Sequence, residues 1–129
     1  MTTRTASEIF LVDSPGWLEY LSEDSKAAAF GHYIENESAL VVPSLVVFEV
    51  YRQVARLRGK PLADRFLSQA LSCRVVAFDE MTAVAAANAS LDYRLSMPEA
   101  ILYSTARSHQ AQLVTSNTRF RGLPQTIIL

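Results

Sequence analysis

Four oxygen-bearing side chains occupy similar places relative to the apolar segments of this 129-residue chain. Asp13 and Asn117 directly follow short apolar runs, whereas Glu49 and Glu99 lie early in segments with a helical pattern. If the apolar runs are parallel strands, the side chains that follow them meet at one edge of the sheet, beyond the carboxyl ends of the strands. The sequence therefore predicts a cluster of three carboxylates and one amide.

Each of these side chains also has an ordinary structural explanation. Asp13 suits a helix cap, Glu49 suits a solvated helix face, and Glu99 suits the positive end of a helix dipole. Asn117 is of a type that is common in turns. No single position indicates chemistry, so the predicted site depends on the fold bringing all four together.

Short, continuous apolar runs alternate along the chain with segments of helical pattern. Such runs are typical of strands buried on both faces, as in parallel sheets covered by helices. We therefore expect a single α/β domain over residues 1–129, with a central, mainly parallel sheet of about five strands. The expected strands are 8–12, 39–42, 73–78, 112–116 and 126–129, and the expected helices are 17–21, 25–35, 45–59, 61–72, 80–91 and 97–109.

Local signals indicate where these helices begin and end. Ser14 and Pro15 are expected to cap and open the first helix. Ser44 is expected to cap a long helix that Gly59 closes, and Asp79 to cap a later one. The apolar anchors of the long helix are expected to be Leu45, Phe48, Val54 and Leu57.

Composition narrows the class of protein. Half of the residues are apolar and the net charge is −1, which suits a globular core and excludes the broadly basic field of a general nucleic-acid binder. No apolar run approaches the roughly 20 residues of a membrane span. Residues 1–10 lack the features of a signal peptide, and the lone Cys73 cannot form an internal disulfide. We therefore expect a cytoplasmic protein with no membrane partner.

Four segments, in order, resemble a known family. They are "VDSPGWLEYL", "VVPSLVVFEV", "LSMPEAILYSTA" and "LVTSNTRF", and together they look like a PIN-domain ribonuclease, most closely a VapC-type toxin of a toxin–antitoxin pair. The resemblance extends from about Phe10 to Leu129. It implies a three-layer α/β/α fold and a metal-dependent endoribonuclease, a hydrolase that cuts RNA phosphodiester bonds and is neutralised by a cognate antitoxin.

Carried over to this chain, the resemblance makes Asp13 the first acid of the site and Glu49 the second. Glu99 stands where the family usually has Asp, and Asn117 stands where many members have another Asp. All four are therefore expected to be catalytic and to bind metal. Because oxygen ligands favour hard cations, the expected cofactor is Mg²⁺ or Mn²⁺. The candidate RNA-binding residues are Ser14, Thr115, Ser116, Arg119 and Arg121.

The two departures from the family pattern have physical consequences. Glu in place of Asp moves a carboxylate outward by roughly 1.5 Å, and Asn in place of Asp removes a negative charge. We therefore expect Glu99 and Asn117 to weaken metal binding and activity. A catalytically weak or silent module that binds RNA or protein stays open as the alternative, and metal-dependent cleavage would discriminate the two.

Other features bear on partners and on rival chemistries. The segment "VVPSLVVFEVY" has more apolar positions than one buried helix face requires, so we expect a homodimer and a groove for an antitoxin tail. Arg52 and Arg56 suit contacts to RNA or antitoxin and equally suit a solvated face.

A phosphoryl-transfer domain is disfavoured because no second acid stands beside Asp13 and no lysine follows 112–116. His32 and His109 lack a second ligand at metal spacing, which argues against zinc.

Overall fold

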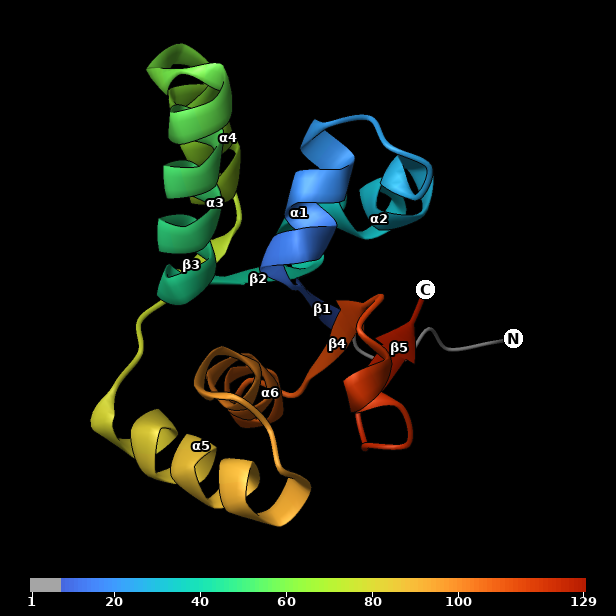
Figure 1. The fold of residues 1–129 in the computed structure, drawn as a ribbon, viewed down its shortest axis with the longest axis vertical. Coiled ribbons are helices and arrows are strands. Elements are labelled where there is room, and N and C mark those ends of the chain that lie inside the picture. Colours follow the sequence, from blue (N-terminus) through green and yellow to red (C-terminus); the bar gives the residue numbers. More distant parts are fainter. Residues whose placement is uncertain (1–7) are drawn as a thin grey trace.

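A five-stranded parallel sheet forms the centre of the molecule in the computed structural model, which describes residues 8–129 (Figure 1). The strand order is β3-β2-β1-β4-β5, and each neighbouring pair is parallel. This confirms the predicted α/β class and the mainly parallel sheet. The strands are β1 (Ile9–Val12), β2 (Leu40–Pro43), β3 (Arg74–Val76), β4 (Ala111–Thr115) and β5 (Thr126–Ile128).

Helices cover both faces of this sheet and confirm the predicted three layers. In Figure 1, α1 and α2 lie on one face, and α6, with α5 packed against it, lies on the other. Helices α3 and α4 pack together as a hairpin, and α3 also contacts α1. The helices are α1 (Ser14–Leu21), α2 (Ala27–Ile34), α3 (Ser44–Arg58), α4 (Lys60–Leu71), α5 (Glu80–Tyr93) and α6 (Met97–Ser108), with short 3₁₀ turns η1 (Glu37–Ala39) and η2 (Thr118–Phe120).

The start of α1 differs from the prediction, and the difference concerns the site. Asp13, not Ser14, is the N-cap, because its Oδ1 accepts a hydrogen bond from the Gly16 N–H at 2.8 Å. Ser14 is the first helical residue, followed by Pro15 in the first turn. The carboxylate that follows β1 therefore also begins the next helix, which fixes its direction.

Two other predicted element ends also need correction. Ser44 is the first residue of α3 rather than its cap, and Pro43 occupies the N-cap position without a side-chain hydrogen bond. The strand predicted over 73–78 is limited to β3, because this edge strand has only β2 to pair with and its first two residues are exposed. The Asp79 cap is confirmed, since its Oδ1 accepts from the Thr82 N–H at 2.9 Å.

The buried face of α3 agrees with the prediction only in part. Of the predicted anchors, Val54 is buried and Leu45 packs half-buried against the core. Val46, Val50 and Val54 are buried, at the four-residue spacing of one helix face. Phe48 and Leu57, predicted as anchors, are 64% and 59% exposed. The sheet and α1 therefore bury the valine face, and Phe48 faces solvent beside the predicted site.

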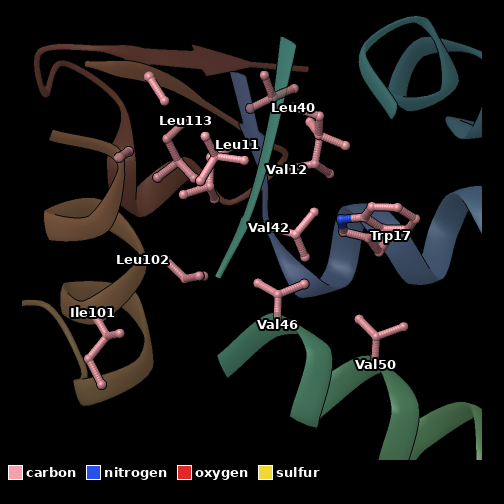
Figure 2. Close-up of a cluster of buried hydrophobic side chains, with 14 of the residues drawn as sticks. Leu11, Val12, Trp17, Leu40, Val42, Val46, Val50, Ile101, Leu102 and Leu113 are labelled. Carbon is pink, nitrogen blue, oxygen red and sulfur yellow. The ribbon is translucent and has the colours of Figure 1, made fainter. Parts of the chain in front are cut away.

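The core lies on both sides of the central strands (Figure 2). On one side, Val42 of β2 lies with Trp17 of α1 and the valines of α3. On the other side, Leu113 of β4 lies with Leu102 of α6. The Trp17 ring also meets the Phe66 ring of α4 edge to face, with centroids 5.1 Å apart. This two-sided burial explains the continuous apolar runs in the sequence.

The strand order creates a switch point between β1 and β4. The chain passes from β1 to β2 and β3 on one side, then crosses to β4 and β5 on the other. Open parallel sheets bind their ligands in the crevice beyond the carboxyl ends of the strands at such a point. Asp13 directly follows β1 and Thr115 ends β4, so both lie at this crevice.

Residues 1–7 lie outside the described part of the chain, and with them most of the segment that is expected not to be a signal peptide. Within residues 8–129, no helix is both long enough and apolar enough to cross a bilayer. The cytoplasmic location stays a prediction.

Gly16 allows α1 to lie close to the core. A Cβ at Gly16 would lie 2.6 Å from Phe30 Cε1 and 2.7 Å from Val12 Cγ1, and both neighbours are fully buried. We expect Gly16→Ala to lower the free energy of unfolding in urea by about 1–3 kcal/mol, the usual cost of overpacking.

Gly31→Ala on α2 is the matched control. Its Cβ would first meet the Tyr20 ring at 3.1 Å, and this half-buried ring can shift. Inside a helix, alanine is also more stable than glycine by up to about 1 kcal/mol. Equal losses of stability in the two variants would contradict the special role of Gly16.

Candidate active site

The four predicted side chains line one cleft of about 490 Å³. Asp13 comes from the β1–α1 junction, Glu49 from α3, Glu99 from the first turn of α6 and Asn117 from the segment after β4. The predicted convergence at the carboxyl edge of the sheet is therefore present in the structure. Other lining residues are Ser14, Pro15, Leu18, Phe48, Arg52, Gln53, Pro98, Leu102 and Phe120.

Asp13 is the most buried acid of this cleft, at 3% exposure. Its Oδ2 accepts a 2.5 Å hydrogen bond from Thr115 Oγ1, while Oδ1 accepts from Gly16. Burial raises the pKa of Asp13 above its ordinary value; the bonds from Thr115 and Gly16 oppose this, and the nearby Glu49 adds to it. The carboxylate is held rigidly by neutral donors.

Glu49 is held by the start of α1. Its Oε1 accepts a 2.6 Å hydrogen bond from Ser14 Oγ, across 35 residues of sequence. Ser14 is buried and Glu49 is half-buried. The Ser14 hydroxyl, a candidate RNA contact in the sequence, therefore serves to orient the second acid.

Glu99 has the most hydrogen-bond donors around it. It forms a capping box with Ser96 at the start of α6, accepting from the Ser96 N–H at 2.9 Å. Its Oε2 accepts from Asn117 Nδ2 at 2.9 Å, and its Oε1 pairs with Arg119 Nε at 3.1 Å. Burial raises the pKa of Glu99, but the bonds from Ser96 and Asn117 and the Arg119 charge outweigh it and lower the pKa below its ordinary value.

Asn117 combines the two roles that the sequence left open, because it forms a turn after β4 and also contacts an acid of the cleft. Its Oδ1 caps η2 by accepting from the Arg119 N–H at 3.0 Å, and its own N–H donates to Thr115 Oγ1 at 2.9 Å. At the same time its amide nitrogen donates to Glu99. In this arrangement Asn117 orients an acid of the site.

The candidate RNA-binding residues differ in their access to the cleft. Thr115 is fully buried and positions Asp13, and Ser116 is half-buried beside it. Arg119 is bound to Glu99, and Arg121 is exposed but is not part of the cleft lining. These placements leave Arg121 without a defined role at the cleft.

Arg52 is better placed than sequence reasoning indicated. It is exposed, it lines the cleft, and within residues 8–129 its side chain makes no hydrogen bond or ion pair. By contrast, Arg56 donates to Gln53 at 2.9 Å. The signal in the sequence was the spacing of three residues between Glu49 and Arg52, which places both on one side of a helix.

The side chains fit a hard divalent cation by chemistry, without a preformed cage. Among residues 8–129 there is no group of three or more His, Cys, Asp or Glu side chains close enough to hold a metal ion. The cleft nevertheless offers oxygen donors from Asp13, Glu49, Glu99 and Asn117. Mg²⁺ is commonly bound through one or two carboxylates together with waters and a substrate phosphate. Asp13 and one further acid would meet that requirement.

Comparison with known families identifies this arrangement. The PIN-domain family model matches residues 10–125, which include every residue of the cleft. The chain belongs to the PIN-domain family. Comparison of the sequence with curated proteins finds no significant match.

Solved structures share this PIN fold over most of their length. A toxin–antitoxin complex from Klebsiella pneumoniae has a TM-score of 0.80 at 20% identity, covering 92% of this chain and 95% of that chain. VapC20 from Mycobacterium tuberculosis, described as a sarcin–ricin loop cleaving toxin, has a TM-score of 0.72 at 13% identity, with 90% and 95% covered. VapBC2 from Rickettsia felis, bound to a promoter DNA fragment, has a TM-score of 0.72 at 15% identity, with 94% and 97% covered. At 13–20% identity these likenesses show a shared fold, in agreement with the match to the PIN-domain family model.

Burial of Asp13 makes stability depend on pH. Since its pKa is raised, the folded state binds more protons than the unfolded state between the ordinary value of 3.8 and the raised pKa. Stability contributed by this group is therefore present at low pH and lost as pH rises through that window. Asp13→Asn keeps an oxygen to cap α1 and should be more stable than wild type at neutral pH, in chelator, with the advantage disappearing near pH 3.8.

Chemical denaturation at the two pH values measures this difference. If Asp13→Asn is less stable than wild type by the same amount at both, the buried carboxylate does not carry the cost that its surroundings indicate.

Proposed function

We propose that this protein is a metal-dependent endoribonuclease and a VapC-type toxin neutralised by a cognate antitoxin. The observation that carries the proposal is the cleft at the switch point of a PIN fold, lined by Asp13, Glu49, Glu99 and Asn117. RNA as substrate is supported by the description of the similarly folded VapC20 as a cleaving toxin of the sarcin–ricin loop.

Some residues of the cleft would bind the metal ion and the RNA, and others orient those binding residues. Asp13, fixed by Thr115 and Gly16, presents a rigid oxygen at the floor of the cleft, and Ser14 directs Glu49 toward the same space. Mg²⁺ or Mn²⁺ bound there would neutralise charge at the scissile phosphate and acidify a water for attack. The exposed Arg52 at the cleft would bind a phosphate of the RNA. This local positive charge would attract RNA although the net charge of the chain is −1.

A second candidate function follows from the way Glu99 is engaged. Its carboxylate already accepts from Ser96, Asn117 and Arg119, and residues 8–129 contain no three-acid cluster for a metal. These contacts favour a weakly active or silent module that binds RNA without cutting it. Binding without metal-dependent cleavage is the result that would select this alternative.

Cleavage of a structured RNA by the purified protein tests the first proposal. We expect cleavage with Mn²⁺ and none with chelator, leaving 5′-phosphate and 3′-hydroxyl ends. Asp13→Asn should lower the rate by more than about 100-fold, because loss of even an outer-shell partner of a metal costs 10–100-fold.

Asp92→Asn is the matched control for this experiment. Asp92 is an exposed acid of α5 that does not line the cleft, so the same chemical change there should leave the rate unaltered. Cleavage that persists in chelator or in Asp13→Asn would contradict the assignment.

An apolar groove beside the cleft suits the proposed antitoxin. The groove, of about 530 Å³, lies on α3 and α4 and shares Phe48 and Arg52 with the cleft. An antitoxin tail seated there would cover the mouth of the site, with apolar side chains in the groove. The remaining groove residues are Val47, Tyr51, Ala55 and Leu67.

The proposed homodimer has a separate apolar surface available. Met81, Val84 and Leu91 on α5 are 60–80% exposed, and this much apolar surface on one helix is typical of an interface. Light scattering at micromolar concentration should give twice the mass of the chain, and Leu91→Glu should shift the protein toward the monomer. Leu71→Glu, an exposed leucine on α4, is the control. A strictly monomeric wild type would contradict the dimer.

A further inference from the structure

Arg119 joins two acceptors that belong to different elements. Its Nε pairs with Glu99 Oε1 at 3.1 Å, and its terminal NH2 group donates to the carbonyl oxygen of Arg94 at 2.7 Å. Arg94 is the C-cap of α5, in the left-handed region at φ 56°. The guanidinium is thus directed at Glu99 by a backbone carbonyl at the negative end of a helix.

This contact sets Glu99 apart from the other acids of the cleft. Asp13 and Glu49 accept only from neutral donors, namely the Thr115 and Ser14 hydroxyls and the Gly16 N–H. Glu99 alone among the acids that line the cleft has a cationic partner in residues 8–129. Asp13 and Glu49 therefore have no positive charge paired with them, whereas Glu99 is already paired with the Arg119 guanidinium.

The different exposures of Arg119 and Glu99 would allow a cation to replace Arg119 as the partner of Glu99. The Arg119 side chain is 58% exposed, whereas that of Glu99 is 16% exposed. An ion pair with so exposed an arginine is weak, and the arginine can swing into solvent while Glu99 stays at the cleft. A divalent cation that approached Glu99 would meet the positive charge of the guanidinium, which lies 3.1 Å from Oε1, and would be repelled by it.

We propose that Arg119 is a built-in counter-ion of Glu99, which a divalent cation must displace in order to reach that carboxylate. The proposal rests on the proposed metal-dependent function of the cleft. Displacement releases a guanidinium at the edge of the cleft, where it can bind an RNA phosphate. Arg119 is thus a positioning residue in the metal-free protein and a phosphate contact in the loaded one.

Calorimetric titration with Mn²⁺, without RNA, tests the exchange. Arg119→Gln removes the competing charge, and we expect Mn²⁺ to bind roughly two- to fivefold more tightly, the size expected for loss of an exposed ion pair. Arg121→Gln removes the same charge two residues along, from an exposed side chain that forms no ion pair with Glu99, and should leave Mn²⁺ affinity at the wild-type value. In a Glu99→Gln background, Arg119→Gln should have no effect on affinity.

Equal or weaker Mn²⁺ binding by folded Arg119→Gln, or no Mn²⁺ binding by any variant, overturns the proposal. If thermal melting shows that Arg119→Gln does not fold, Arg119→Met replaces it. Methionine keeps an aliphatic stem but carries no charge, so Mn²⁺ should again bind more tightly than to wild type. RNA cleavage by wild type reports separately on the function. Cleavage with equal affinities rejects only the exchange, whereas tighter binding without cleavage rejects only the nuclease.

Discussion

The hydrogen bond from Thr115 Oγ1 to Asp13 Oδ2 is the contact on which the site depends. At 2.5 Å it joins the end of β4 to the residue after β1, across the point where the strand order reverses. The Thr115 oxygen also accepts from the Asn117 N–H, which places the segment after β4. The other Asp13 oxygen accepts from Gly16 and starts α1. Because a buried polar group without its partner costs about 1–3 kcal/mol, this pairing fixes the geometry of both strand ends.

The three acids that line the cleft have different surroundings. Asp13 is buried among neutral donors, and its raised pKa reflects the cost. Glu49 accepts a hydrogen bond from the Ser14 hydroxyl. Glu99 has the Arg119 charge and the Asn117 amide, which lower its pKa. Each carboxylate is therefore stabilised in a different way, and the charge of Arg119 offsets part of the repulsion among them.

The sequence was sufficient to predict the sheet and the convergence of Asp13, Glu49, Glu99 and Asn117. Apolar runs mark buried parallel strands, and parallel topology brings the strand ends together. It was not sufficient for the contacts between those side chains. The Asn117 amide meets Glu99 across 18 residues and Arg119 meets it across 20, so both contacts depend on where α6 lies. Likewise Phe48 was assigned to the core because α3 has apolar residues on several sides, and only packing against the sheet and α1 selects the buried one.

We propose that this cleft binds a divalent cation through Asp13, with Glu99 released from Arg119. Anomalous diffraction from crystals soaked in Mn²⁺ would locate that cation. We expect a manganese peak in contact with the Asp13 carboxylate, with the Arg119–Glu99 pair broken and the Thr115–Asp13 hydrogen bond retained. A cleft with no manganese, or a manganese peak elsewhere while Arg119 remains on Glu99, would contradict it.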